Sequence, residues 1–365
     1  MKLRELATFL ETLAPLALQE DYDNSGLIVG DPERELSGAL ISLDCTEAVI
    51  DEAIALGFNL VISHHPIVFR GLKKFNGKSY VERVVIKAIK NDIAIYAIHT
   101  NFDNVLEGVN KKICDKLGII DPWILKPKEG SLKKLVTFCP DADAENIRKA
   151  LFDVGAGRIG DYSECSYNIQ GFGTFKAGQG ANPFVGEIGK RHTESELRIE
   201  TVYPASIERK LIAALLEVHP YEEVAYDLYP ISNAHPQVGS GMIGNLRSDQ
   251  DEIEFLKFIK DVLNAKVIRH TAVRGKMIRR VAVCGGSGSF LLGNAINAGA
   301  DIFVTADFKY HEFFDAEGKV IIADVGHFES EQFTQDLLLE LITEKFSNFA
   351  LRLTAQNTNP INYLI

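Results

Sequence analysis

Short runs of β-branched residues alternate with stretches of helical periodicity over the first 125 or so residues, and this alternation limits the possible folds more than any other feature. It predicts strands at 39–43, 59–63 and 93–98, with helices at 47–56, 80–90 and 108–117. Gly57 and Gly118 follow two of these helices and are suited to ending them. The β-α-β-α-β-α order is typical of a parallel sheet flanked by helices.

The pattern changes near residue 125. A segment rich in Pro, Lys and Gly at 126–130 predicts a linker, and a Gly-rich stretch covers 171–189. The residues between and after them predict strands at 135–138, 197–202 and 224–228 and helices at 145–154 and 207–218. The resulting β-α-β-β-α-β order suggests a ferredoxin-like module, which is followed by an expected loop through His235, Pro236 and 239–241.

The α/β alternation returns in the last third of the chain. Helices are expected at 252–263, 290–298 and 329–344, and strands at 280–284, 301–305 and 320–323. We therefore predict an α/β domain, formed by residues 1–126 and 236–365 around one sheet, that is interrupted by a ferredoxin-like α+β domain at 127–235. The length of 365 residues is consistent with two or three folded units at about 150 residues each.

Composition narrows the function classes. The formal net charge of −11 disfavours general attraction to nucleic acid or to anionic lipid. The five cysteines are widely spaced and form no C-x-x-C pair, which argues against disulfides and thiolate zinc and suggests a cytoplasmic protein. No secretory signal is evident, and no run reaches the roughly 18 apolar residues of a membrane span.

Three polar clusters directly follow predicted strands. They are Ser63-His64-His65-Pro66, the segment 99–104 (His-Thr-Asn-Phe-Asp-Asn) and the segment 324–331 (Asp-Val-Gly-His-Phe-Glu-Ser-Glu). Because the carboxyl ends of parallel strands share one edge of a sheet, we expect these distant segments to meet there.

The clusters contain imidazoles and carboxylates without thiols, a donor set that suits Zn, Mn, Fe, Co or Ni. Pro66 forces a turn that lets His64 and His65 face one pocket, and His327 and Glu331 are four residues apart on one helical face. With Asp103 these make five donors, more than one open catalytic zinc usually takes, so a site for two divalent ions is predicted. Any single histidine could instead be a capped, exposed or core residue.

Other polar residues are candidates for the same site, but their sequence pattern is less specific for metal binding or catalysis. His99 could orient a ligand, and His311 could carry protons in the same cleft or lie on a helix surface. Backbone amides at Gly286, Ser287 and Gly288 could hold an anionic group of a substrate, although a tight strand-to-helix turn that borders the pocket is the safer interpretation. The segment 22–26 reads as a turn whose Asn24 and Ser25 could face a ligand.

Four motifs taken together resemble one family: Asp-Asn-Ser-Gly-Leu at 23–27, Ser-His-His-Pro at 63–66, His-Thr-Asn-Phe-Asp at 99–103 and Gly-His-Phe-Glu-Ser-Glu at 326–331. The chain resembles the GTP cyclohydrolase 1 type 2 homologs, also called Nif-three-like proteins. The segment 219–230 looks like part of the PII-like insertion of the longer bacterial members. The resemblance implies a dinuclear metal centre on His64, His65, Asp103, His327 and Glu331, and ring-shaped homohexamers.

The leading hypothesis is a metal-dependent hydrolase for a nucleotide-like substrate, with GTP ring opening to dihydroneopterin triphosphate and formate as the activity described for some relatives. One alternative is a dinuclear phosphoesterase. The other is a metal-handling or regulatory protein without catalysis, whose inserted domain binds a small ligand or mediates assembly. His219, Tyr221 and Glu222 of that domain are expected to serve packing or subunit contacts.

Overall fold

Two β-sheets, rather than the single sheet expected from the sequence, form the larger part of the structure. The computed structural model describes residues 1–364 and divides the chain into two units. Unit 1 comprises Met1–Pro127 and Pro236–Ile365, and unit 2 comprises Lys128–His235. Strand periodicity indicates which residues are extended but not which strands pair, so the number of sheets was not determined by it.

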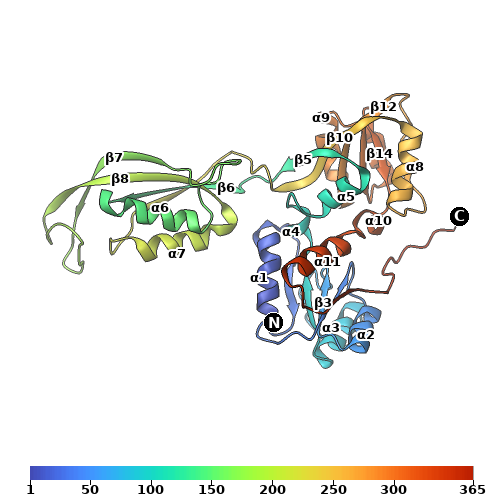
Figure 1. Ribbon diagram of the computed structural model, residues 1–365, viewed down its shortest axis with the longest axis horizontal. Coiled ribbons are helices and arrows are strands. Elements are labelled where there is room, and N and C mark those ends of the chain that lie inside the picture. Colours follow the sequence, from blue (N-terminus) through green and yellow to red (C-terminus); the bar gives the residue numbers. More distant parts are fainter. Residues whose placement is uncertain (365) are drawn as a thin grey trace. The chain divides into compact units, whose positions relative to one another are not determined.

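The first sheet of unit 1 has five strands and includes the strand labelled β3 in Figure 1. Their order is β1 (Gly26–Val29), β4 (Ala94–Ala97), β3 (Leu60–Ser63), β2 (Ala39–Ser42) and β15 (Leu351–Leu353). β1 is antiparallel to β4, and the other pairs are parallel. Leu40, Val61 and Ile95 pack on one face against α2 (Glu47–Leu56) and α3 (Tyr80–Lys90). The alternate residues pack on the other face with α1 (Leu3–Leu13) and α11 (Thr334–Lys345), so both faces are buried.

The second sheet of unit 1 has six strands. Their order is β11 (Arg269–His270), β14 (Ile321–Asp324), β13 (Ile302–Ala306), β12 (Met277–Ser287), β10 (Gly239–Asp251) and β5 (Ile120–Pro127). Only β12, β13 and β14 run parallel. Residues of α5 (Val109–Leu117) and α8 (Glu252–Val262) join the large core cluster that also contains the inner residues of the first sheet. α9 (Leu292–Asn297) packs on the opposite face, in a smaller cluster.

Strands β5 and β10 correct the sequence prediction, which placed a linker at 126–130 and a loop at 239–241. The two strands pair, with Gly239 opposite Pro127. A Cβ atom at Gly239 would lie 2.2 Å from the carbonyl oxygen of Lys126, so a glycine is required where the two backbones approach each other. Pro127 and Gly239 therefore belong to a close strand pair, whereas residues 128–130 lie between β5 and β6 and outside both strands.

The predicted helix at 329–344 is also divided. The structure has α10 (His327–Glu331) and, from Thr334, α11. The break falls at Gln332 and Phe333, where no glycine or proline marks it in the sequence. The remaining short elements of unit 1 are α4 (Thr100–Asp103) and the 3-10 turns η1 (Leu16–Leu18), η4 (Ser289–Leu291) and η5 (Tyr310–Ala316).

Unit 2 has a four-stranded antiparallel sheet with two helices on one face. Its elements are β6 (Leu132–Cys139), η2 (Asp141–Asp143), α6 (Ala144–Asp153), β7 (Tyr167–Lys176), β8 (Arg191–Pro204), η3 (Ala205–Ile207), α7 (Glu208–Val218) and β9 (Tyr226–Pro230). The strand order is β7-β8-β6-β9, and the chain order is β-α-β-β-α-β, which is the arrangement of ferredoxin-like folds. Across residues 1–364 the structure contains no helix with the length and apolar character of a membrane span.

Candidate metal centre

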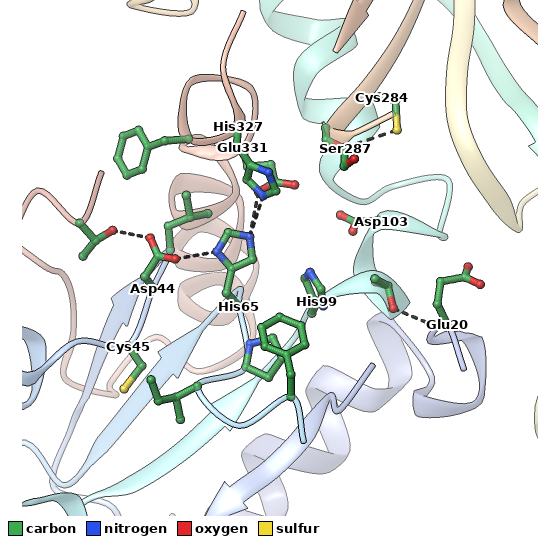
Figure 2. A pocket seen from close by; sticks show the side chains of 18 of the residues that line it. Glu20, Asp44, Cys45, His65, His99, Asp103, Cys284, Ser287, His327 and Glu331 are labelled. Carbon is green, nitrogen blue, oxygen red and sulfur yellow. Dashed lines mark hydrogen bonds and ion pairs between the residues drawn. The ribbon is translucent and has the colours of Figure 1, made fainter. Parts of the chain in front are cut away.

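A cavity of about 630 Å³ in unit 1 is lined by most of the imidazole and carboxylate side chains that the sequence singled out, whereas His64 is fully buried and is not part of the lining. Figure 2 shows His65, His99, Asp103, His327 and Glu331 around it. His65 follows β3 and His99 follows β4 in the first sheet, whereas His327 and Glu331 lie on α10 after β14 of the second sheet. The segments therefore meet between two sheets and not along one shared edge.

One ring nitrogen of His64, Nε2, has no hydrogen-bond partner among the described residues. The side chain is fully buried, and its Nδ1 lies 2.8 Å from the carbonyl oxygen of Ile98. Because a carbonyl only accepts, Nδ1 carries a hydrogen, and in the neutral ring Nε2 then carries the lone pair. That Nε2 lies 3.6 Å from Asp103 Oδ1 and 3.8 Å from Glu331 Oε1. His64 Nε2 and Asp103 Oδ1 are both buried without a hydrogen-bond partner among the described residues.

In His65 and His327, as in His64, Nδ1 is held by an oxygen atom. Their Nε2 atoms converge at a second position. Their Nδ1 atoms lie 2.7 Å from carboxylate oxygens, of Asp44 for His65 and of Asp307 for His327. Their Nε2 atoms lie 3.3 Å apart. Glu331 Oε2 lies 3.0 Å from His65 Nε2 and 3.1 Å from His327 Nε2. Three electron-pair donors thus converge, and a proton or a metal ion is needed to relieve their repulsion.

The pKa values show that protons on the histidines offset the repulsion between the converging donor atoms. Burial alone would lower the pKa of His65 and His327, but the hydrogen bonds and charges of their carboxylate neighbours raise it to about 9 and about 11, respectively. Burial together with the charge of Glu331 raises the pKa of Asp103 to about 7. Glu331 keeps its negative charge because the surrounding histidines hold its pKa well below the usual value despite its burial.

Glu331 belongs to both groups of donors. Its Oε1 faces His64, and its Oε2 faces His65 and His327. The donor atoms of His65, His327 and Glu331 form one set compatible with a metal ion, and those of His64, Asp103 and Glu331 form another. Gly286 provides the space, because a Cβ atom there would lie 2.3 Å from Glu331 Oε1. The donors present fit a site for divalent metal.

His99 lies beside these two sets. Its Nδ1 is 2.8 Å from Asp23 Oδ1, and its ring centroid is 5.2 Å from that of His64 and 5.3 Å from that of His65. His64, His65 and His99 form a third set of possible donors. His99 therefore faces the cavity with Nε2 while Asp23 holds the other nitrogen.

Two expectations about other residues need correction. His311 is exposed on η5, contacts the rings of Tyr310 and Phe314, and is not among the residues that line the cavity. A sequence position shortly after a strand did not bring it to the cleft. Its predicted role in proton transfer therefore has no support from its position.

The glycine segment gives the second correction. Ser287 lines the cavity, but the amide of Gly286 donates to Ser330 Oγ at 2.9 Å and is not available to an anion. Gly288 packs against Thr305, whose Oγ1 would lie 2.2 Å from an added Cβ. These two glycines allow close packing around α10 and β13, which is the structural explanation that the sequence left open.

Three acids orient the histidines and were not predicted to do so from the sequence. Asp44, Asp307 and Asp23 each hold the Nδ1 of one cavity histidine, which directs its Nε2 inward. Asp44 and Asp307 come directly after or close to the ends of β2 and β13, so a search for strand-end acids would have found them. The C-terminal segment also contributes: Thr358 Oγ1 donates to Asp44 Oδ2 at 2.7 Å, and Pro360 and Ile361 line the cavity.

The rest of the lining is apolar, neutral polar or acidic. Exposed aromatic side chains stand around it, namely Tyr22, Phe69, Tyr80 and Phe290. Within residues 1–364 no lysine or arginine lines this cavity. A bound anion would therefore find no positive side chain of this chain in the lining, other than protonated histidine.

Comparison with known proteins assigns the chain to a family. The model of the Duf34/NIF3 family (NGG1p interacting factor 3) matches residues 1–360. The chain belongs to this family. It is 39% identical over 360 residues to the GTP cyclohydrolase 1 type 2 homolog of Halalkalibacterium halodurans, covering 97% of this chain and 96% of the relative. The Bacillus subtilis protein of the same name is 35% identical over 366 residues, covering 99% and 98%.

A solved structure agrees with the fold over the whole chain. The crystal structure of a Bacillus cereus protein related to NIF3 matches with a TM-score of 0.84 and 38% identity, covering 100% of this chain and 99% of that one. The resemblance seen in the sequence motifs is therefore confirmed at the level of the family.

Proposed function

We propose that this NIF3-family protein is a hydrolase that uses two divalent metal ions. The observation that supports this most strongly is the pair of buried, unpartnered electron-pair donors, His64 Nε2 and Asp103 Oδ1, which face a carboxylate shared with a second donor set. Burying polar atoms without partners costs about 1–3 kcal/mol each, and a cation removes this cost. Zinc is the ion that we expect first, with Mn, Fe, Co and Ni also compatible with the donors.

Each side chain has a distinct task in this proposal. His65 and His327 with Glu331 Oε2 would hold one ion, and His64 and Asp103 with Glu331 Oε1 would hold the other. Bound ions would lower the pKa of a water molecule and draw negative charge from the bond under attack. Asp23 holds Nδ1 of His99, so the Nε2 atom faces the cavity. There it would accept or return a proton.

The lining bears on which bond is cleaved. For GTP ring opening, the activity in the relatives' names, the purine would lie at the metals and the triphosphate would extend along the cavity, which within residues 1–364 is lined by no lysine or arginine. For a phosphate ester the phosphoryl group would lie at the metals and the organic part against Tyr22, Phe69 or Phe290. Because the lining of the single chain lacks positive side chains for a triphosphate, phosphoester hydrolysis is the second candidate function.

Two assays separate these candidates. Metal-loaded protein is incubated with GTP and, separately, with simple aromatic phosphate monoesters, and formate, pterin and inorganic phosphate are measured. Formate and pterin support GTP ring opening, whereas phosphate without ring opening supports the phosphoesterase. No turnover with any of the five metals would reject the hydrolase and leave a metal-handling or regulatory protein.

A matched pair of variants tests the metal site itself. Glu331→Gln should lose most of the bound metal, because Glu331 serves both donor sets. Glu329→Gln is the control: Glu329 is buried on the same helix, accepts a hydrogen bond from Asn359 and belongs to no donor set. Equal metal content in Glu331→Gln and the wild type would contradict the proposed ligands.

We further propose that residues 127–235 are a PII-like, ferredoxin-like insertion in a metal-binding domain made of 1–126 and 236–365, and that the protein is a cytoplasmic homohexamer. The β-α-β-β-α-β order of unit 2 supports the first part. Sedimentation of the purified full chain would measure the oligomeric state.

A further inference from the structure

Unit 2 contains a second cavity, of about 570 Å³, which the proposed hydrolase does not use. All its lining residues belong to unit 2. They come from β7, from Glu196 and Arg198 of β8, from Phe138 of β6, and from the loops at 177–185 and 221–225. We call it the unit 2 cavity.

Aromatic rings form much of its wall. Phe184 and Tyr221 lie with ring centroids 5.9 Å apart, and Phe138, Phe172 and Phe175 also line the cavity. Phe184 is 57% exposed and Phe172 is 79% exposed, so the rings are accessible. Exposed aromatic side chains grouped around a hollow are typical of a binding site for a flat, apolar-faced ligand.

Two glycines keep the floor of the cavity low. On β7, Gly171 lies opposite Glu196 of β8, and a Cβ atom at Gly171 would meet nothing within 4 Å. At Gly173 a Cβ atom would lie 2.0 Å from Glu196 Oε2. Glycine inside a strand weakens the strand and often marks a place where a ligand or another chain segment approaches closely. Here the absence of side chains leaves room over the sheet and for the carboxylate.

Glu196 and Arg198 are the residues of β8 that line the cavity. Glu196 is only 9% exposed, and its Oε1 accepts a hydrogen bond from the Tyr221 hydroxyl at 2.8 Å. Among the described residues, none donates a hydrogen bond to Glu196 Oε2. Two residues along the same strand, Arg198 pairs with Glu200 Oε1 through Nη2 at 2.9 Å, and its buried Nε has no hydrogen-bond partner within residues 1–364. The Glu196 carboxylate and the Arg198 guanidinium thus belong to the same face of β8, on residues whose Cα atoms are on the order of 7 Å apart along the strand.

From this combination we infer that the unit 2 cavity binds a planar nitrogen heterocycle with a 2-amino-oxo edge, such as a guanine base. The amino and ring N–H groups donate to the Glu196 carboxylate, and the ring oxygen accepts from Arg198. The faces of the ring stack on the aromatic wall. A carboxylate rejects ligands whose facing edge has only acceptors, because it would remain unpaired in a buried place.

Guanosine is the probe, and the full-length protein is titrated with it by calorimetry. We expect one molecule to bind per chain, with adenosine, which lacks the adjacent amino and oxo groups, at least about tenfold weaker. Chelation of metal should leave the affinity unchanged, which separates this site from the centre in unit 1. Equal affinity for both nucleosides, or no binding of guanosine, would overturn the inference.

Variants locate the site. Gly171→Val fills the floor without a steric clash, and Glu196→Gln removes the charge, so each should weaken guanosine binding by about tenfold or more. Glu194→Gln is the control, because Glu194 lies on the same face of β8 but does not line the cavity. Unchanged binding in Gly171→Val would refute the location. If Gly171→Val instead breaks an oligomer in sedimentation and guanosine does not bind, the cavity is a contact between copies and the inference is wrong.

Discussion

Gly286→Ala is the substitution for which the structure makes the sharpest prediction. Gly286 has a φ of +60°, and an added Cβ would lie 2.3 Å from Glu331 Oε1. The left-handed backbone costs an alanine about 1–2 kcal/mol. Displacing a buried carboxylate from a closely packed position adds about 1–3 kcal/mol. We therefore expect a loss of about 2–5 kcal/mol in the free energy of unfolding.

The Gly286→Ala substitution should also reduce metal binding strongly. Glu331 lies at hydrogen-bond distance from His65 and His327 and faces His64, so moving it disturbs both donor sets at once. The purified variant should hold well under half of the wild-type metal in elemental analysis after dialysis, while urea unfolding measures its stability.

Gly118→Ala separates backbone strain from the clash. Gly118 has a similar φ of +67°, but a Cβ atom there would meet nothing within 4 Å. This variant should lose about 1–2 kcal/mol and keep its metal. The reasoning fails if Gly286→Ala retains the full metal content, or if both variants lose metal to the same degree.

Three further predictions concern single contacts. Asp307→Ala removes the acceptor that holds Nδ1 of His327, so zinc affinity measured by competition with a chelator should fall by about 10- to 100-fold; an unchanged affinity would count against the orienting role. Thr46→Ala removes the side chain that accepts from the amide of Val49 at the start of α2 and should cost about 1 kcal/mol in urea unfolding without metal loss. Burial lowers the pKa of His219, so the unfolded chain takes up its proton first; stability from this residue is complete above pH 6.5 and is lost as the pH falls below it. His219→Gln should reduce that pH dependence in thermal unfolding, and an unaltered dependence would refute the assignment.

The sequence contained much of the local structure because helix signals are short-range. The periodicity and the following glycine placed a helix at 47–56, which is where α2 lies, and the periodicity alone placed one at 80–90, which is where α3 lies. The end of α2 is fixed by Gly57, whose positive φ of 70° ends the helix. Where glycines serve a strand pair instead, as at Gly239, the same signal was read as a loop, because the partner strand is more than a hundred residues away.

The candidate site divides in the same way. The residue types and their places after buried strands identified the histidines and acids that the structure gathers, and they implied oxygen and nitrogen donors without sulfur. Only the tertiary structure decided that the segments meet between two sheets, that Asp44, Asp307 and Asp23 direct the ring nitrogens, and that His311 lies elsewhere. Chemical type is a property of each residue, whereas orientation depends on long-range strand pairing and packing, for which local periodicity carries no information.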